Sequence, residues 1–191
     1  MKFDAAKLLD DLKTMSESHL KTAGNFRLLH QDVLNHKASS QSWSALECIE
    51  HLNMYGDYYI PEISRRLQAA PDSSNTLFES GLLGNYFAKS MLPKEKLNRM
   101  KTFKDKNPNG RKLDVSVLDK FIDQQNELLK LLEMAGRKDL SRIKTSVSIT
   151  KLLKLKLGDT FRVLIYHNER HLMQAKKAIE NGRPAISSLA R

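Results

Sequence analysis

Two histidines near the C-terminus, His167 and His171, have a spacing that suits metal binding. They lie in residues 160–181, a run without proline or glycine, and this run predicts a helix. A helix advances about 100° per residue, so side chains four residues apart lie on one face. Two imidazoles at these positions can ligate a single ion, although such a pair also arises by chance. The metal interpretation therefore needs a third ligand from elsewhere in the chain.

His51 is the best candidate for that third ligand. It follows a capping box, Ser44-Ala45-Leu46-Glu47, in which the serine and glutamate side chains satisfy free amides at a helix N-terminus. The helix is predicted to run to residue 68 or 69, with a kink at Pro61. His51 lies at the edge of its apolar stripe, as His167 and His171 do on theirs. If these stripes pack together, the three imidazoles meet and leave one side of a metal open, as in catalytic sites.

Apolar residues recur at helical spacing in four stretches: residues 4–21, 45–69, 116–135 and 160–181. No convincing strand pattern accompanies them. The sequence therefore predicts an all-α protein, a four-helix bundle with a long crossover, residues 71–114, between the second and third main helices. A single domain, residues 1–191, accommodates the whole pattern.

Several residues are predicted to begin or end these helices. Gly24 and Asn25 form a plausible stop for the first helix, and Gly136 for the third. Ser116 and Asp159 are candidate N-caps of the third and fourth helices. Two segments have less regular patterns. Residues 77–92 include an apolar piece that could be helical, and residues 143–157, both basic and apolar, remain unassigned.

Composition limits the classes of protein that fit. The single cysteine, Cys48, excludes an internal disulfide and a cysteine-rich zinc module. The N-terminal 20 residues have no uninterrupted apolar run, so they are not a signal peptide. No stretch approaches the length of a membrane span. We expect a cytoplasmic protein.

The formal net charge of +10 raises the alternative of a non-enzymatic protein that binds nucleic acid or other anionic partners. Lysine and arginine are densest in residues 89–112 and 137–156. No recognition motif accompanies them, so a solvated basic surface is the better interpretation and nucleic acid is disfavoured. A preference for anionic small ligands stays open.

The segment Trp43-Ser44-Ala45-Leu46-Glu47 leading to His51, with His167-x-x-x-His171 near the C-terminus, resembles the DinB-like (DinB/YfiT-type) superfamily of four-helix bundles. The resemblance covers about residues 2–182. It implies that His51, His167 and His171 bind a divalent metal, zinc or nickel. It further implies a metal-dependent enzyme of hydrolase or thiol S-transferase type, acting on a small molecule with a low-molecular-weight thiol as one candidate. A homodimer is a candidate assembly.

Other side chains could assist such a site. Glu47, one turn before His51, could act as a general base, although its capping role already explains it. Cys48 could approach the metal, but a buried apolar role is favoured. His19, at the end of the first apolar stripe, is either an extra ligand or packed in the core. Gln125 interrupts a stripe and needs hydrogen-bond partners inside the bundle.

The same helical faces carry candidate substrate-contacting groups. Tyr55 and Tyr58 share the face of His51, and Gln174 could orient a ligand on the last helix. Arg170 lies about 60° round the helix from His167 and could meet an anionic group at the rim. A solvated surface charge is an equally good interpretation of Arg170.

Overall fold

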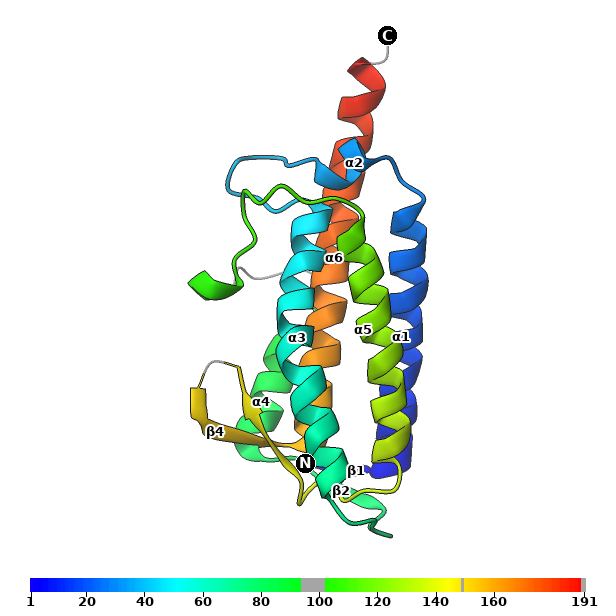
Figure 1. The fold of residues 1–191 in the computed structure, drawn as a ribbon, viewed down its shortest axis with the longest axis vertical. Coiled ribbons are helices and arrows are strands. Elements are labelled where there is room, and N and C mark those ends of the chain that lie inside the picture. Colours follow the sequence, from blue (N-terminus) through cyan, green and yellow to red (C-terminus); the bar gives the residue numbers. More distant parts are fainter. Residues whose placement is uncertain (94–101, 149, 190–191) are drawn as a thin grey trace.

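The computed structural model describes residues 1–93, 102–148 and 150–189 (Figure 1). Its main helices are α1 (Ala5–Arg27), α3 (Ala45–Ala69), α5 (Ser116–Ala135) and α6 (Leu157–Leu189). Helix α5 packs against α1 and α3, and α6 also packs against both of these helices. The four helices therefore close a bundle, and the predicted fold class is confirmed.

The connection between α3 and α5 is the predicted long crossover. It contains β2 (Leu77–Glu79), α4 (Leu82–Met91) and the 3-10 helix η1 (Lys104–Lys106). Helix α4 packs against α6, outside the ring of four. A short helix, α2 (Gln31–Asn35), joins α1 to α3 and also contacts α6. Residues 94–101, part of the basic stretch 89–112 identified from the sequence, lie outside the described residues.

The capping box at the start of α3 is confirmed. The Ser44 hydroxyl accepts a hydrogen bond from the Glu47 amide (3.1 Å), and the Glu47 carboxylate accepts one from the Ser44 amide (2.8 Å). The helix ends at Ala69, with Pro61 inside it. Because the cap fixes where α3 begins, it also fixes where His51 lies on that helix.

Three predicted helix ends are wrong. Helix α1 continues through Gly24 and Asn25 because Phe26, the next residue, packs in the core. Ser116 does not cap α5; its own amide donates to the Asp114 carboxylate (2.8 Å). Asp159 lies inside the first turn of α6, which follows the preceding strand directly. Its buried carboxylate instead accepts hydrogen bonds from Ser80 and Gly81 of the crossover. Asp159 therefore holds the crossover against α6 and is not the N-cap of α6.

The structure also contains two small antiparallel sheets, which the sequence did not predict because no strand pattern was apparent. Strand β1 (Lys2–Asp4) pairs with β2, with Phe3 opposite Phe78. Strands β3 (Lys144–Val147) and β4 (Thr150–Lys156) form a hairpin beside α3. Strands β1, β2 and β3 have only three or four residues, too few to show a period of two. The pairing of β1 with β2 also depends on residues far apart in sequence, while the hairpin pairs neighbouring residues, with the seven-residue strand β4 following a mixed basic-apolar pattern.

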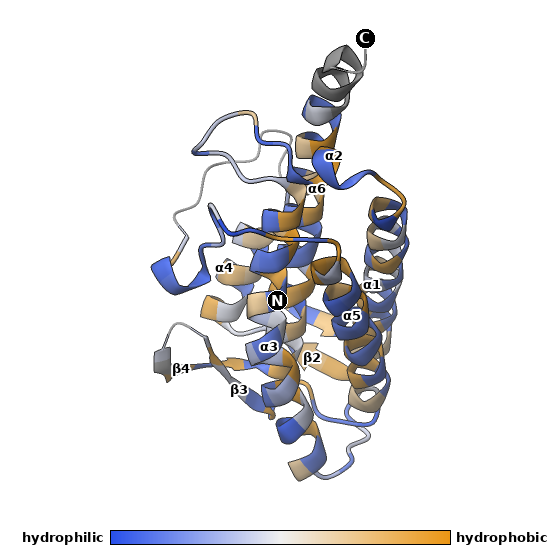
Figure 2. Cartoon of the chain, turned by 45° about the horizontal axis from the view of Figure 1, so that its top comes forward, coloured by the Kyte–Doolittle hydropathy of each residue, from blue (hydrophilic) through white to orange (hydrophobic). Residues whose placement is uncertain are grey.

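The core consists of two apolar clusters, each with members from all four main helices. One contains Leu12, Ile63, Leu128 and Phe161, and the other Phe26, Ile49, Phe121 and Leu172. Figure 2 shows that each main helix carries both hydrophobic and hydrophilic residues, as packing on one face requires. None of the described helices has the length and apolar character to cross a membrane.

Two glycines inside helices, Gly84 on α4 and Gly24 on α1, should respond oppositely to replacement by alanine. A Cβ on Gly84 would lie 2.3 Å from Asp159 Oδ2, and that carboxylate is held by the Gly81 amide (2.8 Å) and Arg162 (3.1 Å). Gly84→Ala should therefore cost about 1–3 kcal/mol of unfolding free energy. Gly24→Ala, with nothing within 4 Å, should add about 0.5–1 kcal/mol.

Urea unfolding followed by circular dichroism measures both changes. Gly24→Ala is the matched control because both glycines lie inside helices. A Gly84→Ala protein as stable as the unsubstituted chain would contradict this account of the α4 contact.

Candidate metal centre

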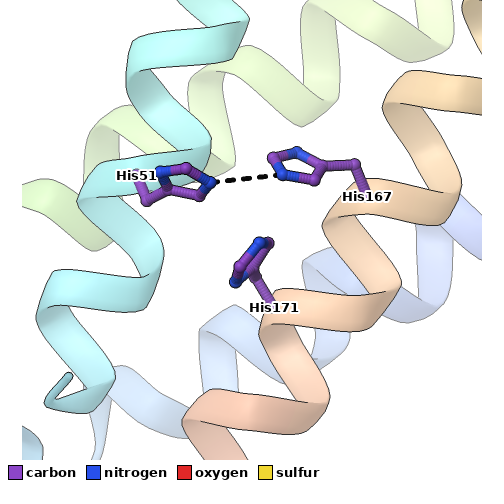
Figure 3. A group of neighbouring side chains, drawn as sticks. All are labelled: His51, His167 and His171. Atoms are coloured by element: carbon purple, nitrogen blue, oxygen red, sulfur yellow. Dashed lines mark hydrogen bonds between the residues drawn. The ribbon is translucent and has the colours of Figure 1, made fainter. Parts of the chain in front are cut away.

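The three histidines predicted from the sequence meet between α3 and α6 (Figure 3). Their ligand nitrogens all lie within 4.8 Å of one another, and His51 Nε2 is 3.2 Å from His167 Nε2. His51 and His167 are buried and His171 is half-buried. The i, i+4 spacing on α6 brings His167 and His171 to one face, and the capped start of α3 brings His51 opposite them.

Two of the rings are held by a hydrogen bond on their far side. The Nδ1–H of His51 donates to the backbone carbonyl oxygen of Lys106 (2.7 Å), and the Nδ1–H of His171 donates to the Gln174 side-chain oxygen (3.0 Å). Since both acceptors are carbonyl oxygens, Nδ1 must carry the proton in the neutral ring. Each Nε2 then carries a lone pair, the form in which histidine ligates metals, and that of His51 faces His167 Nε2.

The surroundings keep the imidazoles neutral. Burial lowers the pKa of His51 from 6.5 to about 4, opposed by the hydrogen bond to the Lys106 carbonyl and assisted by the Lys106 charge. Burial and the neighbouring His51 lower the pKa of His171 to about 3. Burial and the two neighbouring histidines hold the pKa of His167 well below the ordinary value. Neutral imidazole is the metal-binding state, so near neutral pH no proton has to be displaced from these rings.

Three consecutive residues of α6 each bond to a different main helix. His167 contacts His51 on α3, while the Asn168 amide donates to Gln125 on α5 (3.3 Å). Glu169 pairs with His19 on α1 (2.8 Å). These contacts lie between the two apolar clusters and fix how α6 is rotated within the bundle. Gln125 thus has the internal partner that the sequence required, and His19 belongs to this layer and lies outside the histidine cluster.

The 102–111 segment of the crossover passes over the start of α3 and is fastened by Glu47. One oxygen of the Glu47 carboxylate accepts hydrogen bonds from the Gly110 amide (2.6 Å) and the Lys37 ammonium (3.0 Å). The other oxygen completes the capping box. Both oxygens of Glu47 are therefore occupied in structural contacts, and through the segment they hold the Lys106 carbonyl against His51.

A cavity of about 700 Å³ opens beside the histidines. Its walls come from α3, α6, the end of α4, the 102–111 segment and the loop before α3. The described lining residues are Ala38, Ser39, Gln41, Ser42, Trp43, His51, Tyr55, Met91, Thr102, Phe103, Asn107, His167, Arg170, His171, Gln174, Lys177, Ala178 and Asn181. All three histidines line it, so a small molecule in the cavity can reach them.

The cavity brings together some of the predicted substrate-contacting residues and not others. Tyr55, Arg170 and Gln174 line it, and the Tyr55 ring centroid is 4.7 Å from that of His167. Tyr58 does not line it; its hydroxyl donates to the Val147 carbonyl on β3 (3.1 Å), which anchors the hairpin. Cys48 is fully buried in the apolar core, outside the histidine cluster.

Sequence reasoning missed three groups that shape the site. The Lys106 carbonyl that orients His51 is a backbone atom and leaves no sequence signal. Phe103 belongs to a loop whose position no local pattern predicts. Lys177 could have been found, because it lies seven residues after Arg170 and so on the same helical face.

The arrangement fits a divalent metal ion. Two nitrogens bound to one tetrahedral zinc lie about 3.3 Å apart, given zinc–nitrogen bonds of about 2.0–2.1 Å. The His51–His167 separation of 3.2 Å matches this spacing. Neutral rings, fixed tautomers and three nitrogen donors are the chemistry of a three-histidine site, so the cluster could hold a metal ion.

The fold is a helical bundle, and its candidate site is a cluster of three histidines between two of the helices. The family model of the DinB superfamily matches residues 16–175, and the chain belongs to this superfamily. That range contains all three histidines. Comparison with curated proteins and with solved structures gave no match.

The buried imidazoles predict a loss of stability in mild acid for the metal-free protein. An unfolded chain takes up protons below about pH 6.5, while folded His51 resists protonation down to about pH 4. The unfolded state therefore binds more protons in this window, and stability falls as pH falls from 6.5 to 4. His51→Gln should flatten that decline, measured by urea unfolding at several pH values.

His30→Gln is the control for this experiment, because His30 is exposed and is not part of the histidine cluster. It should keep the slope of the unsubstituted protein. An equal slope in the His51→Gln protein would show that the buried ring does not cause the acid sensitivity.

Proposed function

We propose that this DinB-superfamily protein binds a divalent metal, zinc or nickel, through His51, His167 and His171, and is an enzyme acting on a small molecule in the adjoining cavity. The observation that carries the proposal is the set of three neutral imidazoles, two with fixed tautomers, lining one wall of that cavity. A purely structural metal site would have no need of a cavity at its open side.

A divalent ion in such a site supplies Lewis-acid chemistry, because it lowers the pKa of a coordinated water to about 7 and favours a coordinated thiolate. Hydrolysis and thiol S-transfer both follow from this chemistry. The chain's own thiol takes no part: Cys48 is buried, and burial and the nearby Glu47 raise its pKa. In the S-transfer reaction the thiol is therefore a co-substrate.

The other residues at the site position the reactants and hold protons. Burial, with the neighbouring Tyr59 and Asp105, raises the pKa of Tyr55 to about 12, so its phenol remains a hydrogen-bond donor at neutral pH. Trp43 packs beside the histidines, with its ring centroid 4.8 Å from that of His51 and 5.8 Å from that of His171. Gln174 and the Lys106 carbonyl keep His171 and His51 in the ligating tautomer.

Metal retention is the first test. His51→Ala, His167→Ala and His171→Ala should each abolish stoichiometric zinc or nickel binding, since two remaining imidazoles hold a divalent ion far more weakly. Elemental analysis after dialysis against the metal measures the loss. His30→Ala should retain full occupancy. Full occupancy in any of the three cluster variants would show that the ion binds elsewhere.

Turnover separates the two enzyme classes. Zinc- and nickel-loaded protein is assayed on activated esters and amides, and separately on an electrophilic acceptor with a low-molecular-weight thiol. Thiol-independent turnover that disappears in His167→Ala supports a hydrolase, and thiol-dependent turnover supports an S-transferase. Turnover in neither assay would count against an enzyme of either type.

A further inference from the structure

One face of α6 forms a continuous wall of the cavity. The lining residues recur every three or four positions on that helix: His167, Arg170, His171, Gln174, Lys177, Ala178 and Asn181. Arg170 lies beside the histidines, and Lys177 lies two turns further, about 10 Å along the helix axis. The wall therefore carries the candidate metal ligands at one end and a row of polar and cationic groups beyond them.

The charge of this wall is entirely positive. Among the described lining residues, Arg170 and Lys177 are cationic and none is an aspartate or glutamate. Arg170 is only 5% exposed, so its charge is poorly screened by solvent. A divalent ion held by neutral histidines would add two further positive charges. Such a field attracts an anion and disfavours a cation.

The other walls, formed by the loop before α3, the end of α4 and the 102–111 segment, mix polar residues with apolar and aromatic ones. They include Trp43, Met91 and Phe103, and Phe103 is 51% exposed despite its size. An exposed aromatic ring at the mouth of a cavity is available for contact with an apolar ligand surface. The cavity thus combines a cationic wall with apolar and aromatic side chains on its other walls.

We propose that the cavity selects an amphipathic organic anion. Its acid group, a carboxylate or a similar oxyanion, pairs with Arg170 and Lys177, and its apolar body packs against Trp43 and Phe103. Arg170 provides the main selection because its guanidinium is buried and lines the cavity, so its charge acts on an oxyanion with little screening by solvent. Lys177, which is exposed, contributes less. The inference rests on the proposed function, in that it takes this cavity as the substrate site.

Trp43 allows a binding test that does not depend on activity. It is the only tryptophan in the chain and it lines the cavity, so its fluorescence reports occupancy. We would titrate the zinc-loaded and the metal-free protein with 4-phenylbutyrate and with its neutral amide. The carboxylate should bind at least about tenfold more tightly than the amide in both forms. Selection that persists without metal is selection by the side chains and not by the ion.

Three variants locate the selection. Arg170→Gln should bring the two dissociation constants to within about twofold, and Arg170→Lys should keep part of the preference. Lys177→Gln should reduce the preference by about threefold. Lys176→Gln is the matched control, because Lys176 is an exposed neighbour on α6 that does not line the cavity. It should leave both constants unchanged.

Equal affinity for the two probes, including no binding of either, would overturn the inference. A preference lost equally in Lys176→Gln and Lys177→Gln would also overturn it, because general surface charge would then be the cause. The outcome is separable from that of the metal proposal. Metal binding without anion preference refutes only the ligand class, and anion preference in a protein that binds no metal refutes only the metal centre.

Discussion

The position of α6 depends on a layer of buried polar contacts at mid-height in the bundle. His167, Asn168 and Glu169 are consecutive, so their side chains leave the helix in three directions, and each meets a partner on a different main helix. A slide of α6 by one residue would break all three contacts and leave buried polar groups without partners, at a cost of about 1–3 kcal/mol each. The apolar clusters above and below tolerate such shifts better, since hydrophobic packing is not directional.

This layer is one of the contacts that fix the positions of the histidine rings in the cluster. His167 is placed by the rotation of α6, and His51 by a capped helix start and by the Lys106 carbonyl. Glu47 contributes to both features that place His51, because its carboxylate completes the capping box of α3 and also holds the 102–111 segment that carries the Lys106 carbonyl. The general base suggested by the sequence is, in the structure, a residue whose contacts all position other groups.

The sequence predicted those features that depend on local chemistry. The capping box, the i, i+4 histidines and the four amphipathic stripes each lie within one helix, and all are found. Apart from the meeting of the three histidines, several features that depend on distant partners were missed or misassigned. Asp159 has the residue type and position of a cap, yet its carboxylate bonds to Ser80 and Gly81 of the crossover. Tyr58 shares a helical face with His51, yet the hairpin that takes its hydroxyl is built from residues with no clear strand pattern.

The separation of His51 and His167 by 116 residues also has a consequence for how the protein folds. Ligands that far apart are brought together only when the chain has closed its longest loops, late in assembly. A metal ion would then find its three donors only in the completed bundle and would stabilise that state alone, by mass action. Contacts absent from the folding transition state slow unfolding and leave the folding rate unchanged. A metal bound to the histidine cluster would therefore slow unfolding of the native protein and would not speed its folding.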